Sequence, residues 1–261
     1  MRQHSSVWWL LYTSSSWSSA MGELQKIERR LDQRFKKALR DFHLIDEGDH
    51  VLVALSGGKD SLFLVEALAR RSRIKVPAFR VSAVHVRMEN IPYESDTSYL
   101  ETFCEQLQVP LHILTTSFDA SRDHRHTPCF LCSWNRRKQI FNLAQELNCG
   151  KIALGHHQDD IIQTAMMNLV YEGRFSSMPV SLAMKKMPVT IIRPLALCHE
   201  TDIKAYAEAH GYQKQKKLCP YERETQRHQM REVCQSIEAI NPEARYSIWH
   251  ALEREGKLEE S

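Results

Sequence analysis

The sequence predicts an α/β protein in which helices cover both faces of a mostly parallel, five-stranded sheet. Strand-like runs alternate with helical patterns, an order that implies βαβ units. The strand-like runs are residues 50–55, 80–86, 111–115, 151–154 and 189–193. The helical patterns lie near residues 61–71, 94–108, 133–148 and 158–171. Ligands of such sheets bind beyond the carboxyl ends of the strands, so the loops after the first and fourth strands are the places to look for a site.

Composition places the chain among ordinary globular proteins. Of its 261 residues, 43% are hydrophobic and 26% are charged, and the net charge is +3. This mildly basic balance is compatible with RNA binding but does not indicate it. No apolar run approaches the roughly 18 to 20 residues that span a bilayer, so we expect no membrane association. Seven cysteines is an odd number for a disulfide framework, which favours metal or redox use in a reducing compartment, the cytoplasm.

Four segments follow from changes in pattern along the chain. Residues 1–20 are rich in Ser and Trp, and we expect a disordered extension, or residues introduced by the choice of start codon. Residues 21–46 form an amphipathic helix, because apolar residues recur there every three or four positions. Residues 47–195 form the α/β domain. Residues 196–261 are helical, with helices near 202–210, 225–239 and 242–255, and they include Cys219.

The loop after the first strand has the composition of a phosphate-binding site. It reads Ser56, Gly57, Gly58, Lys59, Asp60, Ser61. The glycines let backbone N–H groups approach an anion, and the helix N-terminus that follows adds partial positive charge. Asp60 is unusual in an anion site and suits Mg²⁺ or a reacting group. The loop is not a Walker A motif, since an Asp follows Lys59.

A second candidate segment follows the fourth strand. Gly155, His156 and His157 come at the strand end, where they can flank a nucleotide, and Asp159 and Asp160 follow. Either carboxylate could help Asp60 hold Mg²⁺. Alternatively, both simply favour the N-terminus of the next helix, which stabilises negative charge.

Three cysteines form the candidate metal site. Cys129 and Cys132 make a C-x-x-C pair at the end of a loop, just before a helix, where thiolates are favoured. Cys219, beside a proline, is the best third ligand. Zinc bound with His124 or His126, and a redox dithiol or persulfide carrier, remain alternatives. The other cysteines have no partner at metal-binding spacing and are interpreted as structural.

Basic clusters adjoin both parts of this cysteine site. One follows the C-x-x-C pair and the other precedes Cys219. Their shared position predicts contacts to RNA phosphates. The candidates are Arg136, Arg137, Lys138, Lys214, Lys216 and Lys217.

With these motifs together, residues 22–250 resemble the TtcA family, the tRNA 2-thiocytidine synthetases. The loop Ser56–Ser61 is similar to the PP-loop motif S-G-G-x-D-S of ATP pyrophosphatases. Further shared segments are Gly155–Thr164, Ile192–Ala196, Met178-Pro179 and the Cys129/Cys132 pair. The resemblance implies a Rossmann-like PP-loop ATPase fold, ATP and Mg²⁺. It also implies a [4Fe–4S] cluster on Cys129, Cys132 and Cys219.

The resemblance further implies a tRNA substrate, with sulfur placed on C2 of cytidine 32. ATP would adenylate the 2-oxo group so that AMP leaves, and a sulfide on the open cluster iron would attack. Asp60 and the three cysteines would be catalytic. The loop Ser56–Ser61, with Gly155, His156, Asp159 and Asp160, would bind the cofactor. A sulfur donor such as a cysteine desulfurase would be a partner, and a homodimer is left open.

One departure from the family concerns Glu222, which stands where bacterial members carry a fourth cysteine. It leaves a three-cysteine cluster intact but puts the modified nucleotide in doubt. Thiolation of a tRNA uridine by the same chemistry is one alternative. A zinc-stabilised PP-loop protein that binds or modifies RNA is another.

Overall fold

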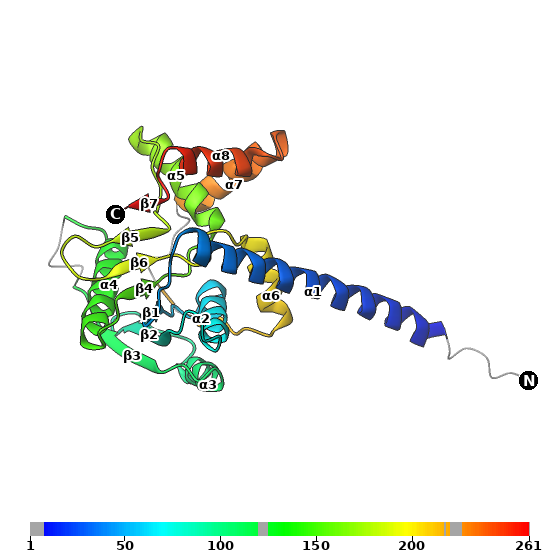
Figure 1. Cartoon of the computed structure of the whole chain (residues 1–261), viewed down its shortest axis with the longest axis horizontal. Helices are drawn as coiled ribbons and strands as arrows, with labels where there is room; N and C mark the ends of the chain where they lie inside the picture. Colours follow the sequence, from blue (N-terminus) through cyan, green and yellow to red (C-terminus); the bar gives the residue numbers. More distant parts are fainter. Residues whose placement is uncertain (1–7, 120–124, 217, 220–225, 261) are drawn as a thin grey trace, which may run out of the picture.

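The computed structural model describes residues 8–119, 125–216, 218–219 and 226–260. One seven-stranded sheet forms its centre, in the order β3-β2-β1-β4-β6-β5-β7 (Figure 1). The strands are β1 (His50–Ala54), β2 (Arg80–Met88), β3 (Leu111–Thr116), β4 (Lys151–Ala153), β5 (Ser181–Ala183), β6 (Thr190–Ile192) and β7 (Glu259–Glu260).

The five predicted strands are confirmed as one parallel array, but five is too few for the whole sheet. β5 pairs antiparallel with β6, with Leu182 opposite Ile191, and β7 pairs with β5. These two strands have three and two residues, too short for a period-2 alternation to be visible in the sequence.

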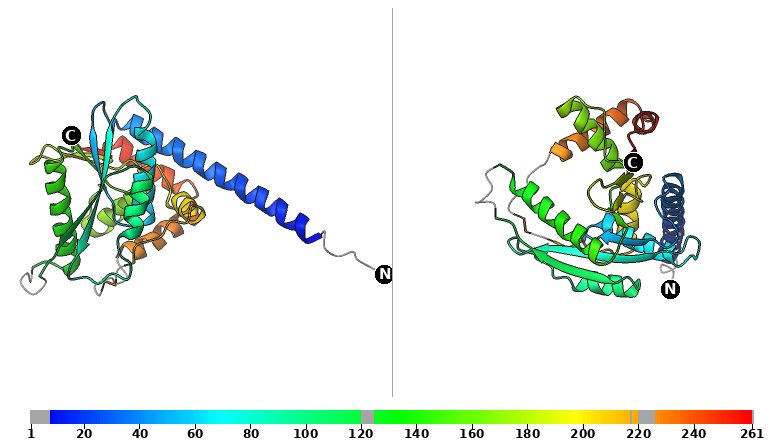
Figure 2. Two further views of the ribbon diagram at one scale, coloured as in Figure 1. Left: turned by 90° about the horizontal axis from the view of Figure 1, so that it is seen from below. Right: turned by 60° about the vertical axis from the view of Figure 1, so that its left-hand side comes forward.

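Helices cover both faces of the sheet, as predicted. They are α1 (Trp8–Asp41), α2 (Lys59–Ser72), α3 (Ser98–Gln106), α4 (Pro128–Glu146), α5 (Gln158–Glu172), α6 (Glu200–Ala209), α7 (Gln226–Ile240) and α8 (Ala244–Arg254). Residues of α1, α2, α3 and α6 share one hydrophobic core with the sheet, whereas α4 packs on the opposite face (Figure 2). The alternating apolar residues of the strands therefore face two separate cores.

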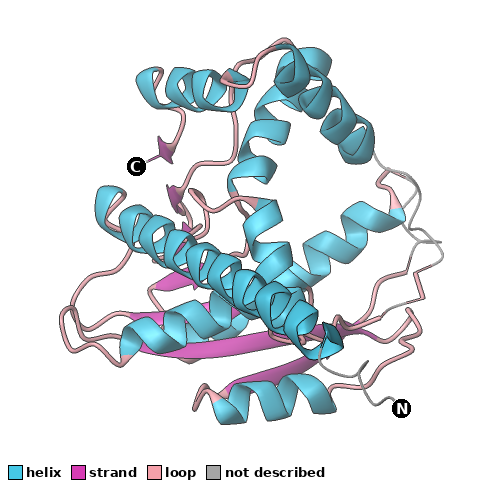
Figure 3. Cartoon of the chain, turned by 90° about the vertical axis from the view of Figure 1, so that its right-hand side faces the viewer, coloured by secondary structure: helices cyan, strands magenta, loops and turns pink. Residues whose placement is uncertain are grey.

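The C-terminal helices α7 and α8 pack on α5 and form a group beside the sheet (Figure 3). Met230 and Cys234 of α7 are buried against Ile162 of α5. This group places arginines of α7 and α8 near the start of α5.

The N-terminal helix is longer than predicted. Residues 1–20 are expected to be disordered and the helix to begin at Met21, but α1 begins at Trp8 and projects past the body (Figure 1). The segment from Trp8 to Ala20 contains no Gly or Pro, and extending an existing helix adds one hydrogen bond for each residue ordered. Residues 1–7 lie outside the described part. α1 is anchored by buried Leu31 and Phe35 and by Arg30, which pairs with Asp202 at 2.6 Å.

The register of the parallel strands brings three loops to one edge. Val53 of β1 lies opposite Ala153 of β4, and Ala153 lies opposite Ile192 of β6. The segments after β1, β4 and β6 therefore emerge side by side. β1 lies between β2 and β4, so this is also where the direction of strand order reverses, the usual ligand position in such sheets. Within the described residues, no helix is both long enough and apolar enough to cross a membrane.

Candidate functional site

The loop between β1 and α2 is built as an anion cradle. Gly57 has φ +83°, a conformation that favours glycine, and Gly58 is the N-cap of α2. The Ser61 hydroxyl donates to the Gly58 carbonyl at 2.9 Å and lies 3.1 Å from the Ser56 hydroxyl. Backbone N–H groups, two hydroxyls and a helix N-terminus thus meet at one place, as the sequence predicts.

Gly155 lets the end of β4 approach this cradle. A Cβ atom at position 155 would lie 3.1 Å from the Ser61 nitrogen and 3.2 Å from the Asp60 carbonyl carbon. These are backbone atoms at the start of α2, which cannot move aside cheaply. The two predicted cofactor-binding segments are therefore in direct contact.

Asp60 has one carboxylate oxygen paired and the other unpaired. Lys59 Nζ lies 3.1 Å from Asp60 Oδ2 and 3.1 Å from Glu200 Oε1. Asp60 Oδ1 is buried and has no hydrogen-bond partner among the described residues; His157 Nε2 lies 3.9 Å away. A buried, unpaired carboxylate oxygen is costly, and a hard cation such as Mg²⁺ would satisfy it.

The next two carboxylates are tied to the C-terminal helices. Asp159 accepts from Arg245 Nη1 at 2.6 Å and from the Glu200 backbone N–H at 2.9 Å. Asp160 accepts from Arg227 Nη1 at 2.8 Å. Burial alone would raise the pKa of Asp159, but the hydrogen bond with His157 and the charge of Arg245 hold that pKa far below its usual range. In this structure Asp160 therefore anchors α7 and Asp159 anchors α8.

The His157 ring lies between Asp60 of the cradle and the carboxylates of Asp159 and Asp160. His157 is the N-cap of α5: its ring Nδ1 accepts from the Asp160 backbone N–H at 3.4 Å, and the His157 backbone N–H donates to Asp160 Oδ2 at 3.1 Å. Burial alone would lower the pKa of His157, but Asp159, Asp160 and Asp60 around the ring raise it. His157 therefore orders α5 and faces the carboxylate cluster.

His156 points to the other side of β4, toward Arg193. Arg193 Nε donates to His156 Nδ1 at 3.3 Å, and Arg193 Nη1 donates to the Pro179 carbonyl. Burial, and next the charge of Arg193, lower the pKa of His156 to about 4, so the ring is neutral at pH 7. Since Nδ1 accepts, we place the proton on Nε2, as a donor. Burial lowers the pKa of Arg193 to about 10, which leaves it charged.

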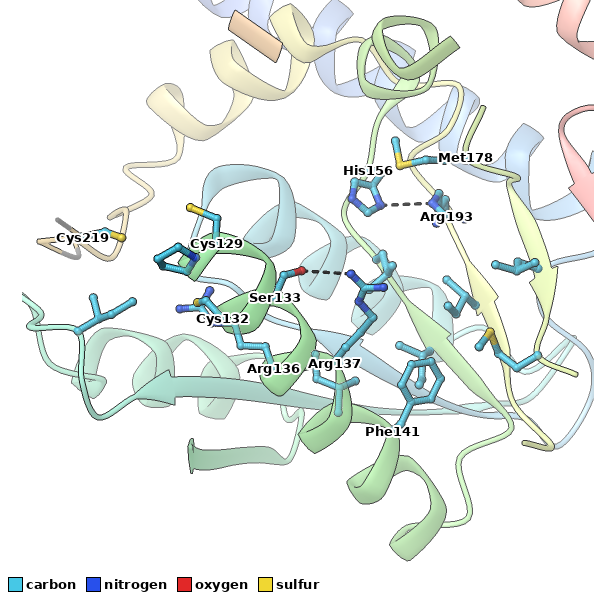
Figure 4. A pocket seen from close by; sticks show the side chains of 18 residues that line it. Cys129, Cys132, Ser133, Arg136, Arg137, Phe141, His156, Met178, Arg193 and Cys219 are labelled. Atoms are coloured by element: carbon cyan, nitrogen blue, oxygen red, sulfur yellow. Dashed lines mark hydrogen bonds between the residues drawn. The ribbon is translucent and has the colours of Figure 1, made fainter. Parts of the chain in front are cut away.

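A pocket of about 760 Å³ runs from this pair to the three candidate cysteines. Figure 4 shows Cys129, Cys132 and Cys219 at one end and His156, Met178 and Arg193 at the other. Apolar side chains of α4 and of the strands form the walls between the two ends. The volume is in the range of small-molecule sites.

The cysteine pair lies inside a helix, not just before one as predicted. Thr127 is the N-cap of α4, its hydroxyl accepts from the Phe130 N–H at 3.3 Å, and Pro128 occupies the first turn. Pro at this position and Thr before it start the helix early, so Cys129 and Cys132 stand one turn apart on it.

Cys219 reaches the pair through an extended segment held on both sides. The Gln215 N–H donates to the Gly57 carbonyl at 3.0 Å, and the Leu218 N–H donates to the Pro92 carbonyl at 2.9 Å. Cys132 and Cys219 then pack against the same small cluster of Met88, Ile91 and Phe118. Two distant parts of the chain therefore present thiols to one end of the pocket.

The three cysteines at one end of the pocket are the kind of donor that both zinc and iron–sulfur clusters take. Among the residues that the structure describes, no three His, Cys, Asp or Glu side chains stand close enough to hold one metal ion. Zinc binds thiolates at about 2.3 Å, and in an iron–sulfur cluster each thiolate binds a different iron. His126 stacks on Phe130 at 4.4 Å, and His124 lies outside the described residues.

The predicted RNA-contacting cations fall on two surfaces. Arg136 and Arg137 line the pocket; Arg136 Nη2 donates to the Tyr93 hydroxyl at 3.1 Å. Lys138 is exposed, and its Nζ lies 5.7 Å from the centre of the Trp134 ring. Lys214 and Lys216 are exposed on the segment that leads to Cys219. Lys217 and Glu222 lie outside the described residues.

Five residues of this site are not predicted from the sequence. They are Tyr93, Glu200, Gln215, Arg227 and Arg245. None belongs to a motif, and each reaches the site from a different part of the chain. Only the charge of Glu200 and of the two arginines could have drawn attention to them.

Comparison with known proteins agrees with this geometry. Residues 24–237 match the PP-loop domain family. The tRNA-cytidine(32) 2-sulfurtransferase of Acaryochloris marina is 36% identical over 238 residues, which are 88% of this chain and 83% of that protein. The same enzyme of Teredinibacter turnerae is 35% identical, over 89% of this chain and 78% of that protein.

A solved structure has the same fold. The U34-tRNA thiolase NcsA from Methanococcus maripaludis, with its [4Fe–4S] cluster, superposes with a TM-score of 0.72 at 26% identity. The match covers 88% of this chain and 79% of that one. The chain therefore belongs to the PP-loop domain family and, within it, to the tRNA-cytidine(32) 2-sulfurtransferases.

Proposed function

We propose that the protein is an ATP-dependent tRNA sulfurtransferase that converts cytidine 32 to 2-thiocytidine. One observation supports this most strongly. Three cysteines from separate parts of the chain line a pocket that also contains His156 and Arg193. The phosphate cradle lies at the same edge of the sheet. The pocket can hold a nucleotide between a site for ATP and a site for sulfur.

The cradle supplies the activation step. The oxygen on C2 of the base attacks the α-phosphorus of ATP; a C–O–P linkage forms and pyrophosphate leaves with the electrons of the broken P–O bond. Backbone N–H groups of Gly57 and Gly58 and the hydroxyls of Ser56 and Ser61 bind the pyrophosphate. Lys59 neutralises part of its charge. Asp60 Oδ1, buried and unpaired among the described residues, is the oxygen that would hold Mg²⁺.

The far wall of the pocket orients the base. His156, neutral and with its proton on Nε2, donates a hydrogen bond to an oxygen of the substrate. Arg193 holds His156 and keeps a positive charge beside the phosphate of the adenylated base. Hydrosulfide then attacks C2 with an electron pair of its sulfur and loses its proton, and AMP leaves with the electrons of the C–O bond.

Cys129, Cys132 and Cys219 would hold a [4Fe–4S] cluster at the other end of the pocket. A cluster held by three thiolates would supply an iron that can bind sulfur. The structural neighbour that carries such a cluster supports this assignment. The sulfur comes from a donor such as a cysteine desulfurase, and a thiol reductant supplies the two electrons that convert its persulfide sulfur to sulfide. The enzyme acts in the cytoplasm.

The test begins with the full chain purified without oxygen. We expect about four irons and four sulfides per chain, and thiolated tRNA when ATP and sulfide are added. Cys219→Ala should lose the iron and the thiolation but still bind ATP. Cys149→Ala, a buried cysteine in the α4 core, is the matched control and should keep both. Thiolation that survives in Cys219→Ala, or zinc in place of iron, would rule out the three-cysteine cluster.

Mapping the modified nucleotide separates the two tRNA targets. Sulfur at position 32 supports the proposal, in line with the sequence relatives. Sulfur at uridine 34 would instead match the activity that names the structural neighbour. The experiment reads the target from the RNA and does not depend on the role of any one residue.

A further inference from the structure

Two large aromatic side chains are exposed on the first turns of α4. Phe130 is 46% exposed and Trp134 is 50% exposed, although apolar rings of this size are usually buried. They are four residues apart and so lie on one side of the helix. Phe130 directly follows Cys129, the first cysteine of the pair. Packing among the described residues therefore leaves about half of each ring uncovered.

The same side of α4 leads into the pocket. Residues 130, 134, 137 and 141 are spaced by four, three and four, so they form one stripe along the helix. The inner two, Arg137 and Phe141, line the pocket (Figure 4). The outer two continue the stripe into solvent. A substrate that enters the pocket along α4 would pass Phe130 and Trp134.

The surroundings of the two rings suit a planar, negatively charged ligand. The His126 ring already stacks on Phe130 in near-parallel fashion, at 4.4 Å and 13°, so a face of this ring accepts a flat partner. Along α4, Arg136, Arg137 and Lys138 are cationic, and the one carboxylate is Glu146 at the far end of the helix. Positive charge beside aromatic rings is the combination that binds single-stranded nucleic acid.

We propose that Phe130 and Trp134 form a stacking platform for the unpaired RNA bases next to the target nucleotide. This rests on the proposed function, in which tRNA is the substrate. A cytidine can enter the pocket only by leaving its stack, which exposes the faces of its neighbours. The platform replaces the lost base stacking, and the three cations contact the adjoining phosphates.

Binding to matched RNA probes tests the platform. The full chain is titrated with a labelled anticodon stem-loop and with a duplex of the same stem that has no unpaired bases. Trp134→Ala should weaken stem-loop binding by roughly 5- to 150-fold, the range for loss of one base stack. Trp134→Phe should restore most of the affinity, and duplex binding should change by less than about twofold in both variants.

Tyr246→Ala is the matched control. Tyr246 is 60% exposed on α8, and its ring lies 4.8 Å from that of His250, so it resembles Phe130 in exposure and in having a histidine neighbour. It should bind both RNAs like the wild type. Melting temperatures of all variants are measured to confirm folding.

The outcomes separate the platform from the proposed function. If the wild type binds the stem-loop and thiolates tRNA but the Phe130→Ala, Trp134→Ala double variant binds equally well, the platform is wrong and the function stands. Equal losses on stem-loop and duplex would also overturn the platform, since stacking requires unpaired bases. If the wild type binds no stem-loop RNA, the proposed function fails and the platform fails with it.

Discussion

Gln215 rests directly on Gly57. The Gln215 N–H donates to the Gly57 carbonyl at 3.0 Å, and a Cβ atom on residue 57 would lie 2.7 Å from Gln215 Cβ. Gly57 belongs to the phosphate cradle, and Gln215 begins the extended segment that presents Cys219. The absence of a side chain at position 57 therefore lets the cradle and the cysteine segment pack together.

Gly57→Ala should damage both ends of the site. The φ of +83° costs a residue with a Cβ roughly 1–2 kcal/mol, and the new Cβ must displace the backbone near Gln215. We expect weaker ATP binding and less iron per chain. Isothermal titration with ATP and iron analysis measure the two effects.

Gly48→Ala separates the backbone strain of a positive φ from the clash with Gln215. Gly48 has the same φ of +83°, but a Cβ there meets nothing within 4 Å. This variant should lose similar stability and keep ATP binding and iron. If both variants lose ATP binding equally, the contact with Gln215 does not matter.

Asp60→Asn should stop ATP cleavage and leave the fold intact. Asn has the shape of Asp but not the charge that holds Mg²⁺, and Asp60 Oδ1 has no hydrogen-bond partner among the described residues. We expect Mg²⁺-dependent release of AMP to fall by about 100-fold or more, with unchanged iron content. Release of AMP at the wild-type rate would contradict a role for Asp60 in metal binding.

Asp159 should make the protein sensitive to acid. Its pKa in the folded state lies below the unfolded value of about 4, because contacts with His157 and Arg245 outweigh burial. The stabilisation is therefore complete above about pH 5 and is lost as the pH falls. Asp159→Asn should lower the free energy of unfolding at pH 7 by about 3 kcal/mol, since it unpairs Arg245.

The acid sensitivity is measured by urea unfolding of both proteins at pH 7 and at about pH 4. The difference between wild type and Asp159→Asn should shrink at the lower pH. A difference that stays constant would mean that Asp159 is not charged and paired in the folded protein.

Arg193→Lys should release His156. A single ammonium cannot replace both the Nε donor to His156 and the Nη1 donor to the Pro179 carbonyl. We expect a loss of about 1.5–3 kcal/mol in stability and slower thiolation. Arg137→Lys, at an exposed position of the same pocket, should change stability by less than about 0.5 kcal/mol. Equal effects in the two variants would show that the buried contacts of Arg193 are unimportant.

Local patterns in the sequence were enough to predict the parallel strands and the cradle. Strand alternation, the Gly57-Gly58 turn and the helix start at Lys59 each depend on residues close together in the chain. The same holds for the early start of α4: Thr127 and Pro128 are a helix-start signal that the sequence analysis did not use.

The ion-pair partners of the site residues come from helices that are distant in the sequence. Asp159 and Asp160, expected near Mg²⁺, pair with Arg245 and Arg227, which come from helices more than sixty residues further along. No periodicity or motif encodes such a pairing, because it exists only once α7 and α8 pack on α5. The unpaired oxygen of Asp60 is likewise visible only when its surroundings are known.

The residue types that suit the proposed chemistry, a glycine turn before a helix, a carboxylate within it and three thiols, can be read from the sequence alone. That Cys219 lines one pocket with Cys129 and Cys132, and with His156 and Arg193, becomes visible only in the folded chain. Local signals act over a few residues, whereas the thiols of this pocket are brought together by contacts between distant parts of the chain, such as the packing of Cys132 and Cys219 on one small apolar cluster.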